Sequence, residues 1–222
     1  MREQLGSRLP EFSEADFSLL REGAVDFYGM NYYTAQFARH RDSPASVNDF
    51  VGNVDELQEN KSGVSIGAKS GVHWLRSAPQ SFRKHLGRIY RLYGKPIYIT
   101  ENGCPCPGED KMAKEESVQD DFRIKYFKDH LEAINQANLS DGALVSGYFA
   151  WSLIDNLGKF LFPLSFLSTY ILLILRVEWS DGFGVRFGVT FTDYETLERT
   201  PKRSALALKY MVADLRKPIP GV

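Results

Sequence analysis

The chain has 222 residues and a formal net charge of -1, with acidic and basic residues mixed along its length. This balance gives no electrostatic case for binding nucleic acid or an acidic membrane surface. The hydrophobic content of 43% is enough to form the core of one soluble domain or two.

The first seventy residues predict one helix, one strand and one long loop. Residues 11–22 are expected to form a short helix, because Ser13 can cap its start and acidic residues follow the cap. The aromatic and β-rich run from 25 to 35 predicts a strand. From 41 to 70 the chain is polar, with scattered Gly, Asn, Ser and Asp, and this predicts a long loop. Loops of this length are usually functional or disordered.

The middle of the chain alternates between helices and short apolar strands. Apolar residues at helical spacing predict a helix over 78–93, which Gly94 ends. Residues 96–100 are nearly all apolar, which is typical of a strand buried on both faces of a parallel sheet. The same reasoning predicts a helix over 114–138 and a second buried strand over 145–154.

Two cysteines, Cys104 and Cys106, follow the first buried strand in a Cys-Pro-Cys run. Two are too few for a disulfide-stapled domain, and a bridge between them would be strained. No second Cys/His pair lies at zinc-finger spacing. We therefore expect two free thiols in a loop and no metal site. The four histidines form no pair at ligand spacing and are expected to be structural: His40, His73, His85 and His130.

The C-terminal part predicts a short strand or hairpin over 185–194 and a closing helix over 201–216. Strands that alternate with helices imply right-handed crossovers and a parallel sheet. The polar motifs follow the carboxyl ends of the strands, where barrel enzymes carry their catalytic groups. Three such units are too few to close an eight-stranded barrel.

One segment does not fit this pattern. Residues 160–175 are uncharged and mostly apolar, between Lys159 and Arg176. They are short for a membrane span and contain Pro163, and a buried core helix is the plainer alternative. A third hypothesis is that residues 158–177 are translated intron. Gly-Lys-Phe can be encoded with a GTAAGT splice donor and Val-Glu with a TAG acceptor, and splicing there keeps the reading frame. Sequencing the mature transcript would decide this.

Six runs together resemble glycoside hydrolase family 1, the β-glucosidase family, and its fungal members most. The runs are DFYGMNYYTA, WLRSAPQSFRKHL, PIYITENG, DDFRIKYFKDHLEAI, SGYFAWSLIDN and EWSDGFGVRFGVTFTDYETLERTPKRSA. The resemblance implies an α/β fold: a partial (β/α)8 TIM barrel, roughly its last three β/α units, in one domain that includes the 41–70 loop and the insert at 158–177. It implies no cofactor. The family's Asn-Glu-Pro strand is absent, so the chain is expected to be truncated.

The resemblance implies that Glu101 is the nucleophile of a retaining glycosidase. Such enzymes need two carboxylates about 5 Å apart, one to attack the anomeric carbon and one to act as acid and base. Glu101 ends a short buried strand, which fixes its carboxylate. On spacing alone, it could equally be a solvated residue at a strand end. Tyr33 matches the tyrosine that hydrogen-bonds the nucleophile and so stabilises its anion.

The resemblance also assigns residues that would bind the substrate, a small β-glycoside. Trp151 matches the indole that stacks on the sugar, although it could be an ordinary core residue. Glu178 matches a group that hydrogen-bonds the far sugar hydroxyls, and its charge would repel a 6-phosphate, which favours an unphosphorylated sugar. The remaining matches are the pocket residue Asn31, the aglycone platform Trp74, Trp179 beside Glu178, and the aromatic Phe187.

Three functions remain open at this stage. The first is a β-glucosidase-type hydrolase that carries only the nucleophile half of its site and is inactive as given, since general acid catalysis contributes roughly 10²–10⁴-fold. The second is a sugar-binding remnant without turnover, and the third is a membrane-anchored protein that uses 160–175. No signal peptide is visible at the start of the sequence, which favours the cytoplasm.

Overall fold

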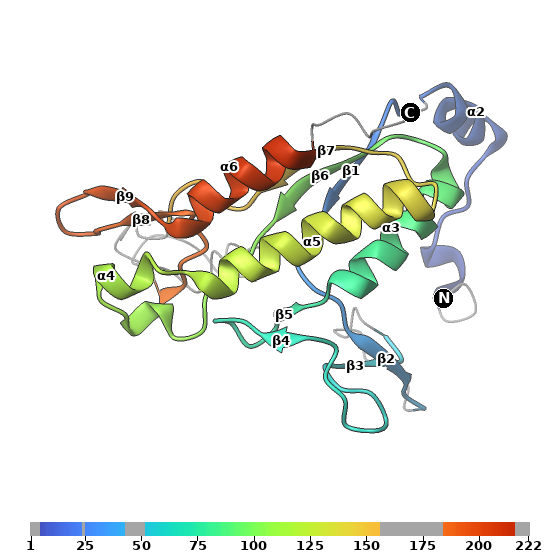
Figure 1. Cartoon of the computed structure of the whole chain (residues 1–222). Helices are drawn as coiled ribbons and strands as arrows, with labels where there is room; N and C mark the ends of the chain where they lie inside the picture. The colour runs from blue at the N-terminus through green and yellow to red at the C-terminus, as the bar shows by residue number, and fades with distance from the viewer. Residues whose placement is uncertain (1–4, 24, 43–51, 156–183, 216–222) are drawn as a thin grey trace, which may run out of the picture.

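The computed structural model describes residues 5–23, 25–42, 52–155 and 184–215 (Figure 1). Its centre is a sheet of three parallel strands in the order β1–β6–β7. The strands are β1 (Tyr28–Asn31), β6 (Ile97–Asn102) and β7 (Val145–Ala150). The expected parallel arrangement is confirmed, although β1 and β7 are shorter than the runs that predicted them. Because the strands are parallel, their carboxyl ends meet at one edge of the sheet.

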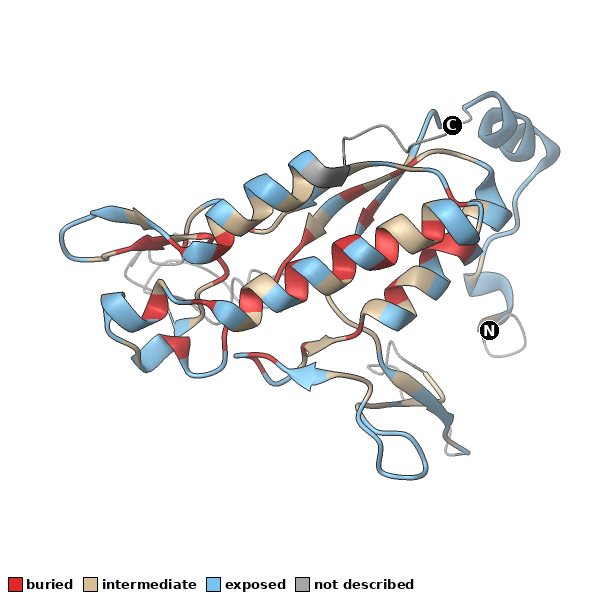
Figure 2. Cartoon of the chain, viewed as in Figure 1, coloured by how far each residue is buried: buried red, intermediate tan, exposed pale blue. Residues whose placement is uncertain are grey.

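Three helices cover one face of this sheet, and α5 lies between the other two (Figure 1). They are α3 (Pro79–Tyr93), α5 (Asp121–Ser140) and α6 (Arg203–Leu215). Buried side chains of β1 and β6 pack against buried side chains of α3 and α5, and Figure 2 shows the resulting buried stripe along α5. Gly94 ends α3 in the left-handed conformation with φ 60°, as its position predicts.

The N-terminal helix is confirmed as α2 (Glu14–Glu22), after a short 3-10 turn, η1 (Gly6–Arg8). The Ser13 hydroxyl accepts a hydrogen bond from the Asp16 backbone, and the Asp16 carboxylate accepts one from the Ser13 backbone. This reciprocal pair satisfies two amide groups at the start of the helix. No residue of α2 is buried, so the capping rather than packing defines it.

The polar stretch 41–70 is more ordered than the expected loop. Residues 43–51 lie outside the described part, but β3 (Val54–Leu57) follows them and pairs antiparallel with β2 (Phe37–His40). Further along, β4 (Ala68–Lys69) pairs with β5 (Arg76–Ser77). The expectation of a loop without strands is therefore corrected. Cross-strand pairing between distant segments stabilises these strands, and the composition of each segment alone does not reveal it.

The predicted helix over 114–138 is divided in two. A single turn, η2 (Glu109–Lys111), leads to α4 (Lys114–Ser117), and α5 begins after a break. At the break, Asp120 has a non-helical backbone, and its carboxylate accepts hydrogen bonds from Arg123 at 2.6 Å and from the Ser204 backbone at 2.9 Å. Tertiary contacts of Asp120 therefore accompany the end of one helix and the start of the next.

The C-terminal elements complete the described fold. A hairpin of β8 (Thr190–Thr192) and β9 (Arg199–Pro201) agrees with the expected short strand or hairpin, and α6 follows it. The described residues form no closed barrel, and the second face of the sheet exposes Phe149. The apolar insert at 158–177 lies outside the described residues. Within the described residues, no helix is long and apolar enough to cross a membrane.

His130 is fully buried in this core, as its expected structural role requires. Its Nδ1 lies 2.8 Å from the Tyr126 carbonyl oxygen, so Nδ1 carries the proton of the neutral ring. Nε2 is buried and has no hydrogen-bond partner among the described residues. Protonation would place an unpaired charge there, and burial accordingly lowers the pKa of His130 to about 4.

Acid should therefore destabilise the chain through His130. The unfolded chain binds this proton at a pKa near 6.5 and the folded chain at about 4, so stability is lost as the pH falls between these values. From about pH 7.5 to about pH 5, this group alone should lower the free energy of unfolding by about 2 kcal/mol. Urea unfolding at both pH values measures the change. The His130→Phe variant should lose that part of the pH dependence, and an identical pH dependence in both proteins would contradict the prediction.

Candidate active site

Glu101 and Tyr33 meet at the carboxyl ends of two neighbouring strands. Glu101 is the penultimate residue of β6 and is partly exposed. Asn31, at the end of β1, lies opposite Glu101 in the strand pairing, and Tyr33 follows two residues later. The Tyr33 hydroxyl donates a hydrogen bond of 2.6 Å to Glu101 Oε2, a length typical of a phenol bound to an ionised carboxylate. Their 68-residue separation is closed by the parallel pairing of β1 and β6.

Aromatic side chains gather around Tyr33. The Trp74 ring meets the Tyr33 ring edge to face, with centroids 6.0 Å apart, and Phe187 does the same at 6.1 Å. Phe187 is fully buried, whereas Trp74 is partly buried on the segment that precedes β5. Edge-to-face contacts of this kind are favourable and fix ring orientation. The structure therefore brings three of the predicted site residues together with Glu101.

Trp151 lies just beyond the end of β7, on the same edge of the sheet. Its backbone N–H donates to the Asn102 carbonyl at 2.8 Å, and its ring packs in the same apolar cluster as Tyr33 and Phe187. The indole Nε1 is buried and has no hydrogen-bond partner among the described residues. A buried indole N–H normally finds an acceptor, which the described residues do not supply here.

The three remaining predicted residues differ in what the structure shows of them. Asn31 is exposed, and its Oδ1 accepts a hydrogen bond of 2.6 Å from Thr100, so it faces the open side of the sheet beside Glu101. Glu178 and Trp179 lie outside the described residues. No cluster of three or more His, Cys, Asp or Glu side chains suited to a metal ion occurs within the described ranges.

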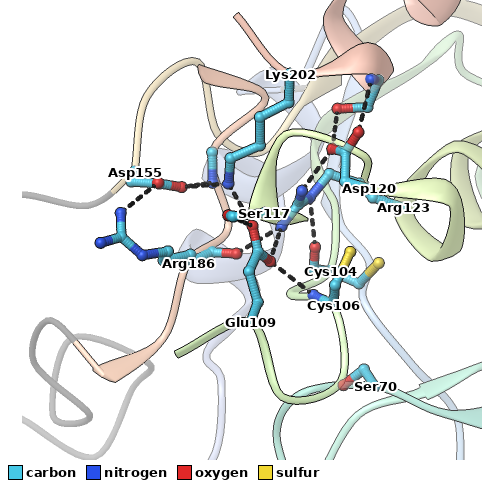
Figure 3. A network of polar contacts seen from close by, with 12 residues as sticks. Ser70, Cys104, Cys106, Glu109, Ser117, Asp120, Arg123, Asp155, Arg186 and Lys202 are labelled. Atoms are coloured by element: carbon cyan, nitrogen blue, oxygen red, sulfur yellow. Dashed lines mark hydrogen bonds and ion pairs between the residues drawn. The ribbon is translucent and has the colours of Figure 1, made fainter. Parts of the chain in front are cut away.

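A buried network of charged side chains, which the sequence patterns did not reveal, connects the segments that follow β6 and β7 (Figure 3). Arg123, on α5, donates to Asp120 at 2.6 Å and to Glu109 at 2.5 Å. It also donates to the backbone carbonyls of Cys104 at 3.0 Å and Arg186 at 2.7 Å. These two carbonyls lie close to Glu101 and Phe187 along the chain, so Arg123 joins both segments of the site.

Lys202 extends this network to the segment after β7. Its Nζ donates to Glu109 Oε1 at 2.6 Å and to Asp155 Oδ1 at 2.7 Å. Asp155 also accepts a hydrogen bond of 2.7 Å from Arg186 and one of 3.1 Å from the Gly188 backbone. The network therefore pairs three carboxylates with three cations, and all but Arg186 are fully or almost fully buried.

Glu109 and Arg123 each favour the ionised form of the other. Burial raises the pKa of Glu109, but Arg123 and Lys202 together lower it by more, so its pKa lies below the usual value. Burial lowers the pKa of Arg123, yet Glu109, Asp120 and the two cysteines raise it well above the usual value. Both groups are therefore charged at neutral pH.

A local signal existed for one member of the network. Arg123 shares a helix face with Tyr126, Phe127 and His130, at spacings of three, four and seven residues. A charged residue on such a buried face needs a buried partner. Lys202 and Asp155 offer no such signal. Lys202 lies 93 and 47 residues from its partners Glu109 and Asp155, and Asp155 lies 31 residues from Arg186.

Cys104 and Cys106 are free, as predicted, and the structure shows that both are buried. Burial raises the pKa of Cys106 to about 11, and it raises the pKa of Cys104 as well. Thiols in this state carry little thiolate and are poor nucleophiles. Among the acidic and thiol groups near the sheet edge, Glu101 is therefore the better candidate for nucleophilic chemistry.

Comparison with known proteins shows which family and which proteins this chain is similar to. The sequence profile of Glycosyl hydrolase family 1 matches residues 1–161. The chain is 36% identical over 204 residues to Beta-glucosidase 1B of Phanerodontia chrysosporium, covering 92% of this chain and 33% of that protein. It is 37% identical over 214 residues to Raucaffricine-O-beta-D-glucosidase of Rauvolfia serpentina, covering 94% of this chain and 36% of that protein. It thus spans about a third of these relatives.

A solved β-glucosidase structure is similar to this chain in both sequence and fold. The chain is 44% identical to beta-glucosidase 2 from the fungus Trichoderma reesei, which was crystallised in complex with Tris. The two superpose with a TM-score of 0.82 over 98% of this chain and 43% of that one. The described strands and helices therefore have the arrangement of the corresponding part of that protein.

Proposed function

Because the chain belongs to glycosyl hydrolase family 1, we propose that Glu101 is the nucleophile of a retaining β-glucosidase-type site, which this chain carries in part. The substrate class is an unphosphorylated β-glucoside, since the relatives named above are β-glucosidases. In this proposal β1, β6 and β7 are three of the eight strands of a (β/α)8 barrel. The acid/base carboxylate belongs to a part of the barrel that these residues do not include.

The hydrogen bond between Tyr33 and Glu101 is the observation that carries this proposal. An attacking carboxylate oxygen must be ionised and held at a fixed angle to the anomeric carbon. The phenol of Tyr33 binds Oε2 at 2.6 Å, which stabilises the anion and leaves Oε1 to attack. The bond from Oε1 to the anomeric carbon forms as the bond to the leaving oxygen breaks, which yields a glycosyl ester on Glu101.

Aromatic residues supply the wall of the sugar site in this proposal. A sugar hydroxyl would accept the hydrogen bond that the buried Nε1 of Trp151 lacks among the described residues. Trp74 would be the platform on the leaving-group side, and Phe187 holds the Tyr33 ring from another direction. Asn31, Glu178 and Trp179 would bind the sugar hydroxyls. We further propose that residues 158–177 are absent from the chain made by the spliced transcript.

Covalent trapping tests the proposed nucleophile. We expect 2,4-dinitrophenyl 2-deoxy-2-fluoro-β-glucoside to leave one fluoroglucosyl group per chain on Glu101, because dinitrophenolate departs without a general acid. Intact-mass measurement and peptide mapping identify the labelled residue, and absorbance follows the released dinitrophenolate. This probe suits the chain because the reaction does not need the acid/base carboxylate.

Matched substitutions make the trapping experiment decisive. Glu101→Gln should abolish the label, whereas Glu56→Gln, an exposed change on β3, should leave it intact. Labelling at another residue, or equal labelling of the Glu101→Gln variant, would refute the assignment. Saturable glucose binding without any label would instead favour a sugar-binding protein without turnover.

A further inference from the structure

Asn102, the residue after Glu101, has a fully buried side chain that joins four elements of the fold. Its Nδ2 donates to the Tyr32 carbonyl at 2.7 Å and to the Tyr126 hydroxyl at 2.9 Å. Its Oδ1 accepts a hydrogen bond of 2.8 Å from the Tyr148 hydroxyl. A carbonyl oxygen can only accept, so the contact with Tyr32 fixes which way the amide points. The side chain thus links β6 to the end of β1, to α5 and to β7.

Tyr126 continues this chain of hydrogen bonds toward the site. Its hydroxyl accepts from Asn102 and donates to the Tyr33 carbonyl at 2.8 Å. A phenol has one proton to donate, and the Tyr33 carbonyl receives it. Tyr126 itself is almost completely buried on α5, between Phe127 and His130, so its ring has a fixed place.

Asn102 and Tyr126 therefore hold two consecutive carbonyl groups, those of Tyr32 and Tyr33. These carbonyls flank the residue whose side chain reaches Glu101 Oε2. Asn102 is also the next residue after Glu101 in the chain. The buried side-chain amide of Asn102 therefore helps to fix the positions of both Tyr33 and Glu101, the two partners of the hydrogen bond. We propose that Asn102 and Tyr126 are positioning residues, which set the geometry between the Tyr33 phenol and the Glu101 carboxylate.

This assignment gives the proposed nucleophile a support that is separate from the buried ionic network. Parallel strand pairing alone allows small changes in register, and the pairing of β1 with β6 is already irregular between Met30 and Asn31. The side-chain hydrogen bonds of Asn102 and Tyr126 hold the carbonyls of Tyr32 and Tyr33, which follow this irregular point directly. Functional groups must be held within about 0.5 Å to act, and a displacement of about 1 Å can cost 10²-fold in rate.

The ¹³C NMR chemical shift of the Tyr33 phenol carbon, Cζ, reports the hydrogen bond between Tyr33 and Glu101. In a chain labelled with ¹³C at tyrosine Cζ, the NMR signal of Tyr33 is identified by its loss in Tyr33→Phe. Glu101→Ala gives the position of that signal when the carboxylate is missing. We expect Tyr126→Phe and Asn102→Asp to move the signal by about half of that difference or more, because each removes a donor that holds the Tyr33 segment.

Tyr32→Phe is the matched control. Tyr32 is the residue next to Tyr33, and its buried hydroxyl donates to the Ala78 carbonyl at 3.0 Å. The substitution removes this hydroxyl and leaves every hydrogen bond of Asn102 and Tyr126 in place. It should lower stability in urea by less than Tyr126→Phe, since it breaks one hydrogen bond of a buried hydroxyl and Tyr126→Phe breaks two. The Tyr33 signal should stay at its original position.

The outcomes separate this inference from the proposed function on which it rests. An unchanged Tyr33 signal in Tyr126→Phe and Asn102→Asp overturns the positioning role, and so does an equal shift in Tyr32→Phe. Trapping by the fluoroglucoside should also slow about tenfold in Tyr126→Phe, as expected for a misplaced nucleophile. If the parent chain cannot be trapped at all, the proposed function fails, while the Tyr33 signal still decides the positioning role.

Discussion

Replacing Lys202 with methionine is expected to lower the free energy of unfolding by about 3–5 kcal/mol, because the change breaks a buried ionic network on one side. The Nζ of Lys202 bridges Glu109 and Asp155 at 2.6 and 2.7 Å, and all three side chains are fully or almost fully buried. Methionine fills similar space but has no donor. Two buried carboxylates would then lose a cation, with Arg123 and Arg186 as their remaining charged partners.

Lys114→Met provides the matched control. Lys114 pairs with Glu198 at 3.0 Å, but both side chains are partly exposed, at 34% and 63%. Water screens such a pair, so its loss should cost about 0–1 kcal/mol. Urea unfolding of both variants at neutral pH measures the difference. A Lys202→Met variant that loses no more stability than Lys114→Met would show that Glu109 and Asp155 do not depend on this cation.

The network matters for the site because of where its members lie in the chain. Arg123 binds the carbonyl of Cys104, three residues after Glu101, and Asp155 lies four residues after Trp151. Arg186 precedes Phe187 directly. One buried cluster thus connects the three segments that carry the proposed nucleophile, Trp151 and Phe187. Glu109, Asp120 and Lys202 are buried and ion-paired, so we assign them a structural role.

Local sequence signals predicted the parts of the fold that local physics determines. The Ser13 cap, the Gly94 helix end and the apolar strand before Glu101 each depend on a few neighbouring residues, and each is found in the structure. The position of Glu101 at a strand end followed from the apolar run that precedes it. The grouping of Tyr33, Trp74 and Phe187 around it followed from the family resemblance, and the structure places them together.

Long-range partners could not be predicted in the same way. Lys202 looks like an ordinary surface lysine in sequence, because its two carboxylate partners come from distant segments. The pairing of β2 with β3 was missed because a polar composition hides strands that are stabilised by their neighbours. Asn102 was seen only as part of a motif, since its role depends on hydroxyl groups from α5 and β7.

Gly103 is the second position where a single substitution should have a large effect. The β carbon of an alanine there would lie 1.7 Å from the Trp151 carbonyl oxygen and 2.8 Å from its carbon. Both are backbone atoms, and the Trp151 N–H is held to the Asn102 carbonyl at 2.8 Å, so neither strand end can yield easily. We expect Gly103→Ala to cost about 3 kcal/mol or more, at the upper end for overpacked positions.

Gly29→Ala separates this steric effect from the general effect of adding a methyl group. Its β carbon would make an ordinary contact of 3.6 Å with the Thr100 side chain, on the neighbouring strand of the same sheet. Its stability should change by no more than about 0.5 kcal/mol. Because the clash at Gly103 separates Trp151 from the strand that carries Glu101, that variant should also lose trapping by the fluoroglucoside. Equal stability of the two variants would mean that β6 and β7 can move apart freely at this edge, which would remove the basis for a preorganised sugar site.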